Sequence, residues 1–182
     1  ADRLAYSYFA THDVPVIITR ASNNYGPYQF PEKILPLFVT NLMDDIQVPL
    51  YGDGGNVRDW LHVLDHCRGI DLIMHTGQNG EVYNIGGGNE VKNIDLTYSI
   101  LSLCGKGKEL IKPVADRKGH DRRYSLSTKK LESMGWAPQV PFEQGLKETV
   151  AWYQANEWWW RPIKERDANY KAYMDAQYGK RG

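Results

Sequence analysis

The sequence is poor in cysteine, has no long apolar run and carries no excess of charge of either sign. Its two cysteines, Cys67 and Cys104, are too few for a disulfide framework and lack the paired spacing of a zinc site. The 22 basic and 22 acidic residues balance, so no overall field attracts the chain to nucleic acid or to a membrane. No apolar stretch approaches the length that spans a bilayer. We therefore expect a cytoplasmic protein with reduced thiols, in which only local clusters of charge bind anions.

The motifs of common catalytic sites are also missing. The sequence contains no GxSxG, CxxC or HExxH motif, and no tyrosine is followed by a lysine four residues later. His62, Asp65 and His66 have helical spacing, but no further ligands accompany them, so we expect no metal site. The 182 residues are therefore expected to hold a ligand and to contribute no catalytic residue.

Strands and helices alternate along most of the chain. This order predicts an α/β fold, with the last part of a parallel sheet followed by a smaller mixed α/β domain. Because the first residues have a helical pattern and no cap, we expect the natural protein to extend upstream of Ala1. The expected strands are 14–20, 48–51, 57–63 and 80–85, and the expected helices are 1–11, 31–44, 65–75, 94–104, a short one ending at 134 and an amphipathic one after Pro141.

Two of these helices carry finer expectations. In the helix at 65–75, Cys67, Ile70 and Met74 are expected to face the core. Asn93 precedes the helix at 94–104, and we expect its side-chain oxygen to cap that helix by accepting a hydrogen bond from an N–H of the first turn.

The most informative segment runs from Ile18 to Lys33. A β-rich run leads into a polar loop, expected at 21–30, that contains Asn23 and Asn24. In α/β proteins a ligand commonly lies beyond the carboxyl ends of the strands, where this loop is expected. The loop offers amides but no nucleophile–base pair, so it predicts a site that holds a ligand. The alternative is that the two asparagines only satisfy buried backbone groups at the strand end.

Three segments are candidates for binding phosphate. Arg58 and the basic cluster at 116–123 are the first two, because an arginine fork can grip phosphate oxygens through two parallel hydrogen bonds. Surface pairing with neighbouring aspartates is their alternative role. The third is the Gly86-Gly87-Gly88 turn, but Val91 stands where a dinucleotide-binding fingerprint needs its third glycine, so we interpret it as a plain turn.

Several motifs occur in an order that is typical of one family. They are RASNNYGPYQFPEK (20–33), PLYGDG (49–54), VRDW (57–60), YNIGG (83–87), Asn93-Ile94 and DRKGHDRRY (116–124). With this set, the chain resembles the C-terminal half of the dTDP-glucose 4,6-dehydratases, which are extended short-chain dehydrogenases/reductases. Related nucleotide-sugar epimerases and decarboxylases share SNNYGP, whereas the Asp-Arg-x-Gly-His-Asp motif is more specific to the thymidine-sugar dehydratases.

The resemblance implies a lyase of deoxysugar biosynthesis that converts dTDP-glucose to dTDP-4-keto-6-deoxyglucose and water. In this family NAD⁺ takes hydride from C4 of the glucose, water is eliminated across C5 and C6, and hydride returns to C6. The glycine fingerprint, the catalytic Asp–Glu pair and Tyr-x-x-x-Lys lie upstream of this sequence in the family. The chain alone is therefore expected to be inactive, and the family implies a homodimer.

The resemblance also implies domain boundaries and site residues. Residues 1–26 would end the NAD-binding Rossmann domain, and 27–182 would mainly form the nucleotide-sugar-binding domain, with 61–86 returning to the Rossmann sheet. Asn23 would contact the nucleotide sugar and Asn24 the NAD. The other expected substrate-binding residues are Lys33, Ile34, Pro49, Leu50 and Tyr51 around the thymidine, and Arg58, Asn93, Asp116, Arg117, Lys118, Gly119 and His120 around the ribose and diphosphate.

Some alternatives stay open on the sequence. Lys118 departs from the family, which usually has proline there, so the position of Arg117 is less defined by the resemblance. A UDP-sugar epimerase or decarboxylase of the same scaffold is the close alternative function. A nucleotide-sugar-binding module without catalysis is the other. The Trp158-Trp159-Trp160 run receives no role.

Overall fold

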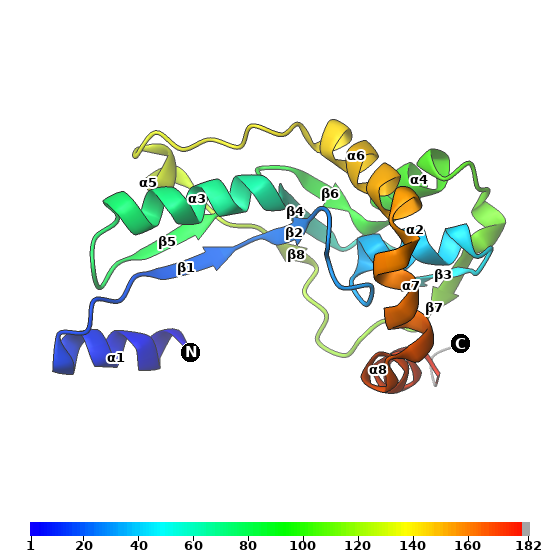
Figure 1. Cartoon of the computed structure of the whole chain (residues 1–182), viewed down its shortest axis with the longest axis horizontal. Helices are drawn as coiled ribbons and strands as arrows, with labels where there is room; N and C mark the ends of the chain where they lie inside the picture. The colour runs from blue at the N-terminus through cyan, green and yellow to red at the C-terminus, as the bar shows by residue number, and fades with distance from the viewer. Residues whose placement is uncertain (180–182) are drawn as a thin grey trace.

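The computed structural model describes residues 1–179. It has a mixed α/β fold in which most strand pairs are parallel, as the sequence predicts. Helix α1 (Asp2–His12) stands at one end of the molecule, apart from the main body (Figure 1), and none of its residues is buried. Within the described residues, no helix combines the length and the apolar composition needed to cross a bilayer.

A two-stranded parallel sheet lies next to α1. Strand β1 (Ile18–Ala21) pairs with β5 (Val82–Ile85), and helix α3 (Val63–Thr76) runs along this pair (Figure 1). The short helix α5 (Lys129–Glu132) packs beside β5. These elements enclose a small core made of Leu61, Ile73, Tyr83, Ile85, Leu131 and Trp136.

Strand β4 (Val57–His62) links this region to the rest of the molecule. Its second half pairs in parallel with β2 (Asn23–Tyr25), and its first half pairs with antiparallel β6 (Glu90–Lys92) and parallel β8 (Arg123–Tyr124). A separate parallel pair joins β3 (Val48–Tyr51) to β7 (Ile111–Val114), which follows the 3₁₀ turn η1 (Lys108–Leu110).

The main core surrounds helix α2 (Ile34–Met43). The helix is apolar on nearly all sides, as expected of a helix enclosed by others, and residues 35–42 are all buried. Helices α4 (Asn93–Leu103) and α6 (Phe142–Ala155) pack against it. Helix α7 (Glu157–Arg166) follows α6, and α8 (Ala168–Tyr178) then runs across the lower side of the molecule in Figure 1.

Several predicted bounds and contacts are wrong. The segment expected as a loop at 21–30 contains strand β2, because β4 offers a pairing edge that local sequence cannot reveal. Helix α2 begins at Ile34, three residues later than expected. Asn93 is the first residue of α4 and makes no capping hydrogen bond, since Lys92 occupies the N-cap position.

Of the three residues of α3 expected to face the core, Ile70 does pack against the small core, but the other two do not. Cys67 and Met74 are exposed, the latter by 70%. The buried positions are instead Asp65, Gly69 and Ile73, which recur at helical spacing. Glycine permits the close approach here, because a Cβ at Gly69 would lie 2.9 Å from a methyl carbon of Ile85.

Asp65 explains this orientation of α3. Its fully buried carboxylate accepts hydrogen bonds from the backbone N–H groups of Gln139 and Val140, both at 3.0 Å, and from Arg68 at 2.8 Å. The indole N–H of Trp136 donates to the Asp65 carbonyl at 3.3 Å. The start of α3 therefore holds the extended segment that connects α5 to α6.

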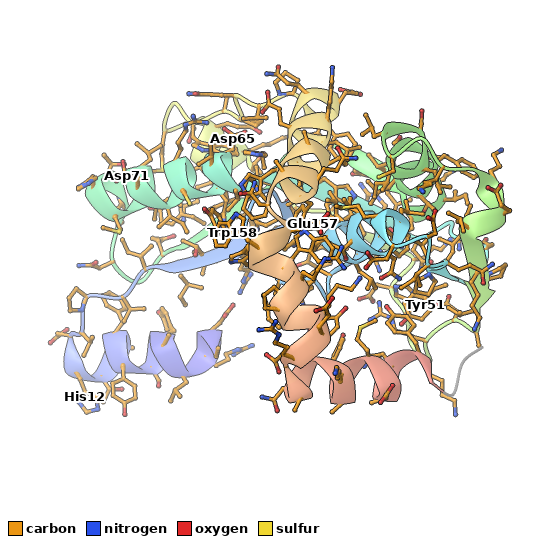
Figure 2. All side chains as sticks on the ribbon, turned by 45° about the vertical axis from the view of Figure 1, so that its right-hand side comes forward. His12, Tyr51, Asp65, Asp71, Glu157 and Trp158 are labelled. Carbon is orange, nitrogen blue, oxygen red and sulfur yellow. The ribbon has the colours of Figure 1, made fainter. Side chains whose placement is uncertain are left out.

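We expect Asp65→Ala to lower the free energy of unfolding by about 3 kcal/mol, because it removes a buried carboxylate that accepts from two backbone N–H groups and a charged arginine. The matched control is Asp71→Ala on the same helix (Figure 2), whose side chain is 75% exposed and should change stability by less than about 0.5 kcal/mol. Urea unfolding followed by circular dichroism measures both. Equal stabilities of the two variants would contradict this role of Asp65.

Candidate functional site

One cavity of about 220 Å³ collects most of the residues that the sequence singled out. Strands β2, β3 and β4, the starts of α2 and α4, the loop before β8 and helix α8 all contribute to its wall. The expected substrate-binding residues in this wall are Asn23, Lys33, Ile34, Pro49, Leu50, Tyr51, Arg58, Asn93, Arg117 and His120.

Tyr51 forms an aromatic side of the cavity, close to helix α8 (Figure 2). Its ring stacks on Tyr178 with centroids 5.9 Å apart and an interplanar angle of 23°, and His120 meets it edge-on at 5.9 Å. The guanidinium of Arg117 lies 5.4 Å from the same centroid, within cation–π range. Burial raises the pKa of Tyr178 well above its usual value, and a hydrogen bond to Tyr51 raises it further, so the Tyr178 phenol stays neutral.

Arg58 and Arg117 bring two positive charges to this cavity. Arg58 donates to the carbonyl oxygens of Val57 at 2.7 Å and Asp121 at 2.8 Å. Partial burial lowers the pKa of Arg58, and the charge of Arg117 lowers it further, while the charges of Asp121 and Asp116 oppose the shift. Two like charges that border one cavity favour an anion between them.

Hydrogen bonds within the loop at 116–120 fix its conformation. The carboxylate of Asp116 contacts Nδ1 of His120 at 2.6 Å and accepts from the Arg117 N–H at 2.8 Å. Its contact with His120 is the main reason that the pKa of Asp116 is lowered. Gly119 turns the loop at a φ of +67°, which other residues rarely adopt. Lys118 and Gly119 line an adjoining hollow of about 190 Å³ that Arg58 and Arg117 also border.

Asn23 and Asn24 lie in a strand, so their side chains point to opposite faces of the sheet. Asn23 lines the cavity, whereas Asn24 does not. The Asn24 amide donates to the Ser22 carbonyl at 3.1 Å, and its own backbone carbonyl accepts from Gln29 at 2.8 Å. Two adjacent asparagines can therefore serve two different sites, one on each face.

Asn93 has a free acceptor as a result of its place in the helix. It does not cap α4, and its buried Oδ1 has no hydrogen-bond partner among residues 1–179. Its side chain borders the cavity. A buried unpaired oxygen is costly, so the amide is suited to a ligand that donates a hydrogen bond, such as a sugar hydroxyl.

The Gly86-Gly87-Gly88 turn is a plain turn, as its missing third glycine predicts. The buried carboxylate of Asp59 accepts from the backbone N–H of Gly87 at 3.0 Å and of Asn89 at 2.8 Å. The Asp59 carboxylate thus accepts the hydrogen bonds from the backbone N–H groups that a phosphate would need. Glycine is required at 87 because a Cβ there would lie 2.0 Å from the Trp60 carbonyl oxygen.

His62 and His66 lie at the start of α3 without forming a metal centre with Asp65. No group of three His, Cys, Asp or Glu side chains in residues 1–179 has the geometry to hold a metal ion. Burial lowers the pKa of both histidines. Nδ1 of His62 accepts from the N–H of Leu64 at 3.3 Å, so this histidine serves as the N-cap of the helix.

The sequence reasoning missed part of the cavity wall. Three of the missed residues lie within or beside the recognised motifs: Glu32, Phe38 and Trp60. The motifs around them could therefore have indicated that they border the site. The α8 contribution had no such signal, because it follows the last motif by many residues. The missed wall residues are Glu32, Phe38, Trp60, Tyr173, Gln177 and Tyr178.

The tryptophan run anchors the tail that carries α8. Trp160 is fully buried, and its indole N–H donates to the Tyr153 carbonyl at 2.9 Å. Trp159 packs edge-on against Tyr28 at 5.6 Å, while Trp158 is 66% exposed. The run therefore packs α7 onto the body and thereby sets where α8 reaches the cavity.

Lys164 adds a polar anchor between α7 and α2. Its ammonium donates to Thr40 Oγ1 at 3.1 Å and Asn41 Oδ1 at 2.9 Å. Burial lowers its pKa to about 8, although Asp44 partly opposes the shift. The neighbouring Arg161 pairs with Asp44 at 2.9 Å.

We expect Lys164 to make the free energy of unfolding rise with pH. Between its folded pKa of about 8 and an unfolded pKa of about 10.4, the unfolded state binds more protons, so stability increases as pH rises through this window. Lys164→Met should remove about 2 kcal/mol of the rise between pH 8 and pH 10, whereas Lys130→Met, at an exposed position, should not. Urea unfolding at pH 8 and pH 10 measures it, and identical slopes for wild type and Lys164→Met would refute it.

Comparison with known proteins identifies the family. The family model described as GDP-mannose 4,6 dehydratase matches residues 1–149. The chain belongs to this family. The dTDP-glucose 4,6-dehydratase of Streptomyces antibioticus is 56% identical over 169 residues, which cover 92% of this chain and 50% of that protein. These matches confirm the resemblance that the motifs indicated.

Solved structures of this family share the fold. The dTDP-glucose 4,6-dehydratase of Streptomyces venezuelae with NAD and TYD bound matches with a TM-score of 0.88 and 53% identity, over 89% of this chain and 51% of that one. The Bacillus anthracis dTDP-glucose 4,6-dehydratase in complex with NAD gives a TM-score of 0.84 and 55% identity, over 89% and 52%. The chain spans about half the length of the curated relatives it matches.

Proposed function

We propose that this chain forms the nucleotide-sugar-binding part of an NAD-dependent dTDP-glucose 4,6-dehydratase. The observation that carries the proposal is that the guanidinium groups of Arg58 and Arg117 border the same cavity as the aromatic and apolar wall around Tyr51. A nucleoside diphosphate needs both features, since its phosphates bind arginine forks and its base packs on apolar surface. The similarity to dTDP-glucose 4,6-dehydratases supports this choice of ligand.

In this proposal the base lies at the Tyr51 end and the diphosphate lies between the two arginines. Asn93 accepts from the ribose, and Asn23 contacts the hexose. Asp116 and Gly119 shape the loop that presents Arg117. The remaining proposed contacts are Lys33, Ile34, Pro49 and Leu50 with the thymidine, and Lys118 and His120 with the ribose and diphosphate end.

NAD is the proposed cofactor, and Asn24 is the proposed contact to it in this chain. The buried Oδ1 of Asn24 and Oγ of Ser22 have no partner within residues 1–179, so they fit a group that donates hydrogen bonds, such as the nicotinamide carboxamide. When bound, NAD supplies reversible acceptance of hydride. We infer that the groups that move protons lie outside this sequence, so the chain alone binds and orients substrate without turning it over.

The activity test uses the intact gene product, dTDP-glucose and NAD, with formation of a 4-keto-6-deoxy sugar as the readout. We expect this product, and we expect the protein to act as a cytoplasmic homodimer. Absence of the product would refute the dehydratase assignment. Tighter binding of UDP than of dTDP would instead favour a UDP-sugar epimerase or decarboxylase, and dTDP-glucose binding without any product would favour a non-catalytic binding module.

We expect Arg58→Ala to weaken dTDP binding by about 1.5–3 kcal/mol, the range of a charge-assisted hydrogen bond. Isothermal titration calorimetry with dTDP measures it. The control is Arg20→Ala, because Arg20 lies on β1 in an exposed ion pair with Asp2 and does not border the cavity. Unchanged dTDP affinity in Arg58→Ala would remove Arg58 from the site.

A further inference from the structure

Asn56 is a buried amide immediately before β4 that the proposed function does not use. It is 1% exposed. Its Nδ2 donates to the carbonyl of Asp121 at 3.2 Å, and its backbone carbonyl accepts from the N–H of Asn93 at 2.9 Å. One residue therefore joins two segments that come to the cavity from distant parts of the chain, the loop after Asp116 and the start of α4.

The carbonyl of Asp121 is a shared acceptor. Arg58 Nη2 donates to this oxygen at 2.8 Å, so the Asn56 amide and the Arg58 guanidinium converge on one atom. The residues that follow Asn56 and Asp121 are also joined, because the Val57 N–H donates to the Arg122 carbonyl at 2.8 Å. The orientation of Arg58 thus depends on where the loop that carries Arg117 is held.

A purely structural role explains Asn56 poorly. Its buried Oδ1 has no hydrogen-bond partner within residues 1–179, and an unpaired buried acceptor costs stability. An apolar side chain of similar volume would avoid that cost but could not donate to the Asp121 carbonyl. The one bond that distinguishes the amide from such a side chain is therefore the bond that Arg58 shares.

We propose that Asn56 is a positioning residue for the diphosphate end of the cavity. Its amide holds the Asp121 carbonyl in place, and this carbonyl orients Arg58. Its backbone carbonyl also connects the loop that carries Arg117 to the start of α4. Asn56 acts through these neighbours and does not contact the ligand. This inference rests on the proposed function, because it assumes that Arg58 and Arg117 bind a diphosphate.

The test compares dTDP with thymidine, which lacks the diphosphate, by calorimetry on the intact gene product. Asn56→Ala should weaken dTDP binding about tenfold, the effect of one hydrogen bond to a charged or buried group, while thymidine affinity changes less than about twofold. Asn56→Leu fills the volume without an amide and should show the same selective loss of dTDP affinity. It provides the test if Asn56→Ala proves too unstable to purify. Asn56→Gln keeps the donor and should restore part of the dTDP affinity.

Asn84 provides the matched control. Its Nδ2 also donates to a backbone carbonyl, that of Ser127, at 3.2 Å, and its Oδ1 is likewise buried without a partner in the described part of the chain. Asn84→Ala should leave both affinities unchanged. Equal loss of dTDP and thymidine binding in Asn56→Leu, or full dTDP affinity in it, would overturn the inference. A wild-type protein that binds no dTDP would instead refute the proposed function itself.

Discussion

Strand β4 is hydrogen bonded to three strands that lead into the site. It pairs with β2, β6 and β8, and these three partners lead into the Asn23 face, the start of α4 and the end of the loop at 116–122. Because side chains alternate along a strand, Arg58 and Trp60 reach the cavity while Asp59 turns away to bind the glycine turn. A shift of one residue in register would exchange the cation for the carboxylate. The chemistry of the site therefore depends on this pairing.

The electrostatic design of the site is local. The chain has no net charge, yet two arginines face one cavity. Two of the neighbouring carboxylates are engaged elsewhere: Asp59 by backbone N–H groups, and Asp116 by His120 and the Arg117 N–H. Arg58 donates two hydrogen bonds to the carbonyls of Val57 and Asp121, which fix its direction without neutralising its charge. A fixed and partly desolvated cation binds an anion with little loss of side-chain entropy.

The sequence predicts those parts of the fold and site that local patterns encode. Motif residues such as Asn23, Tyr51 and Arg58 lie in one cavity, and the missing third glycine correctly predicts a plain turn at 86–88. The roles expected of these residues and of the domains stay predictions.

The remaining features depend on contacts distant in sequence. The buried face of α3 is set by hydrogen bonds from Asp65 to residues 139 and 140, which no helical pattern reveals. Strands β6, β7 and β8 are short and exist through their partners. Helix α8 reaches the cavity only because the tryptophan run and Lys164 fix α7 to the body. Tertiary packing decides such features more than local propensity does.

A crystal structure of the protein with dTDP tests the central claim most directly. The account predicts that the diphosphate oxygens lie within hydrogen-bond distance of both Arg58 and Arg117, with the thymine against Tyr51. A diphosphate bound at the Gly86-Gly87-Gly88 turn, or on any surface that these two arginines do not share, would contradict it.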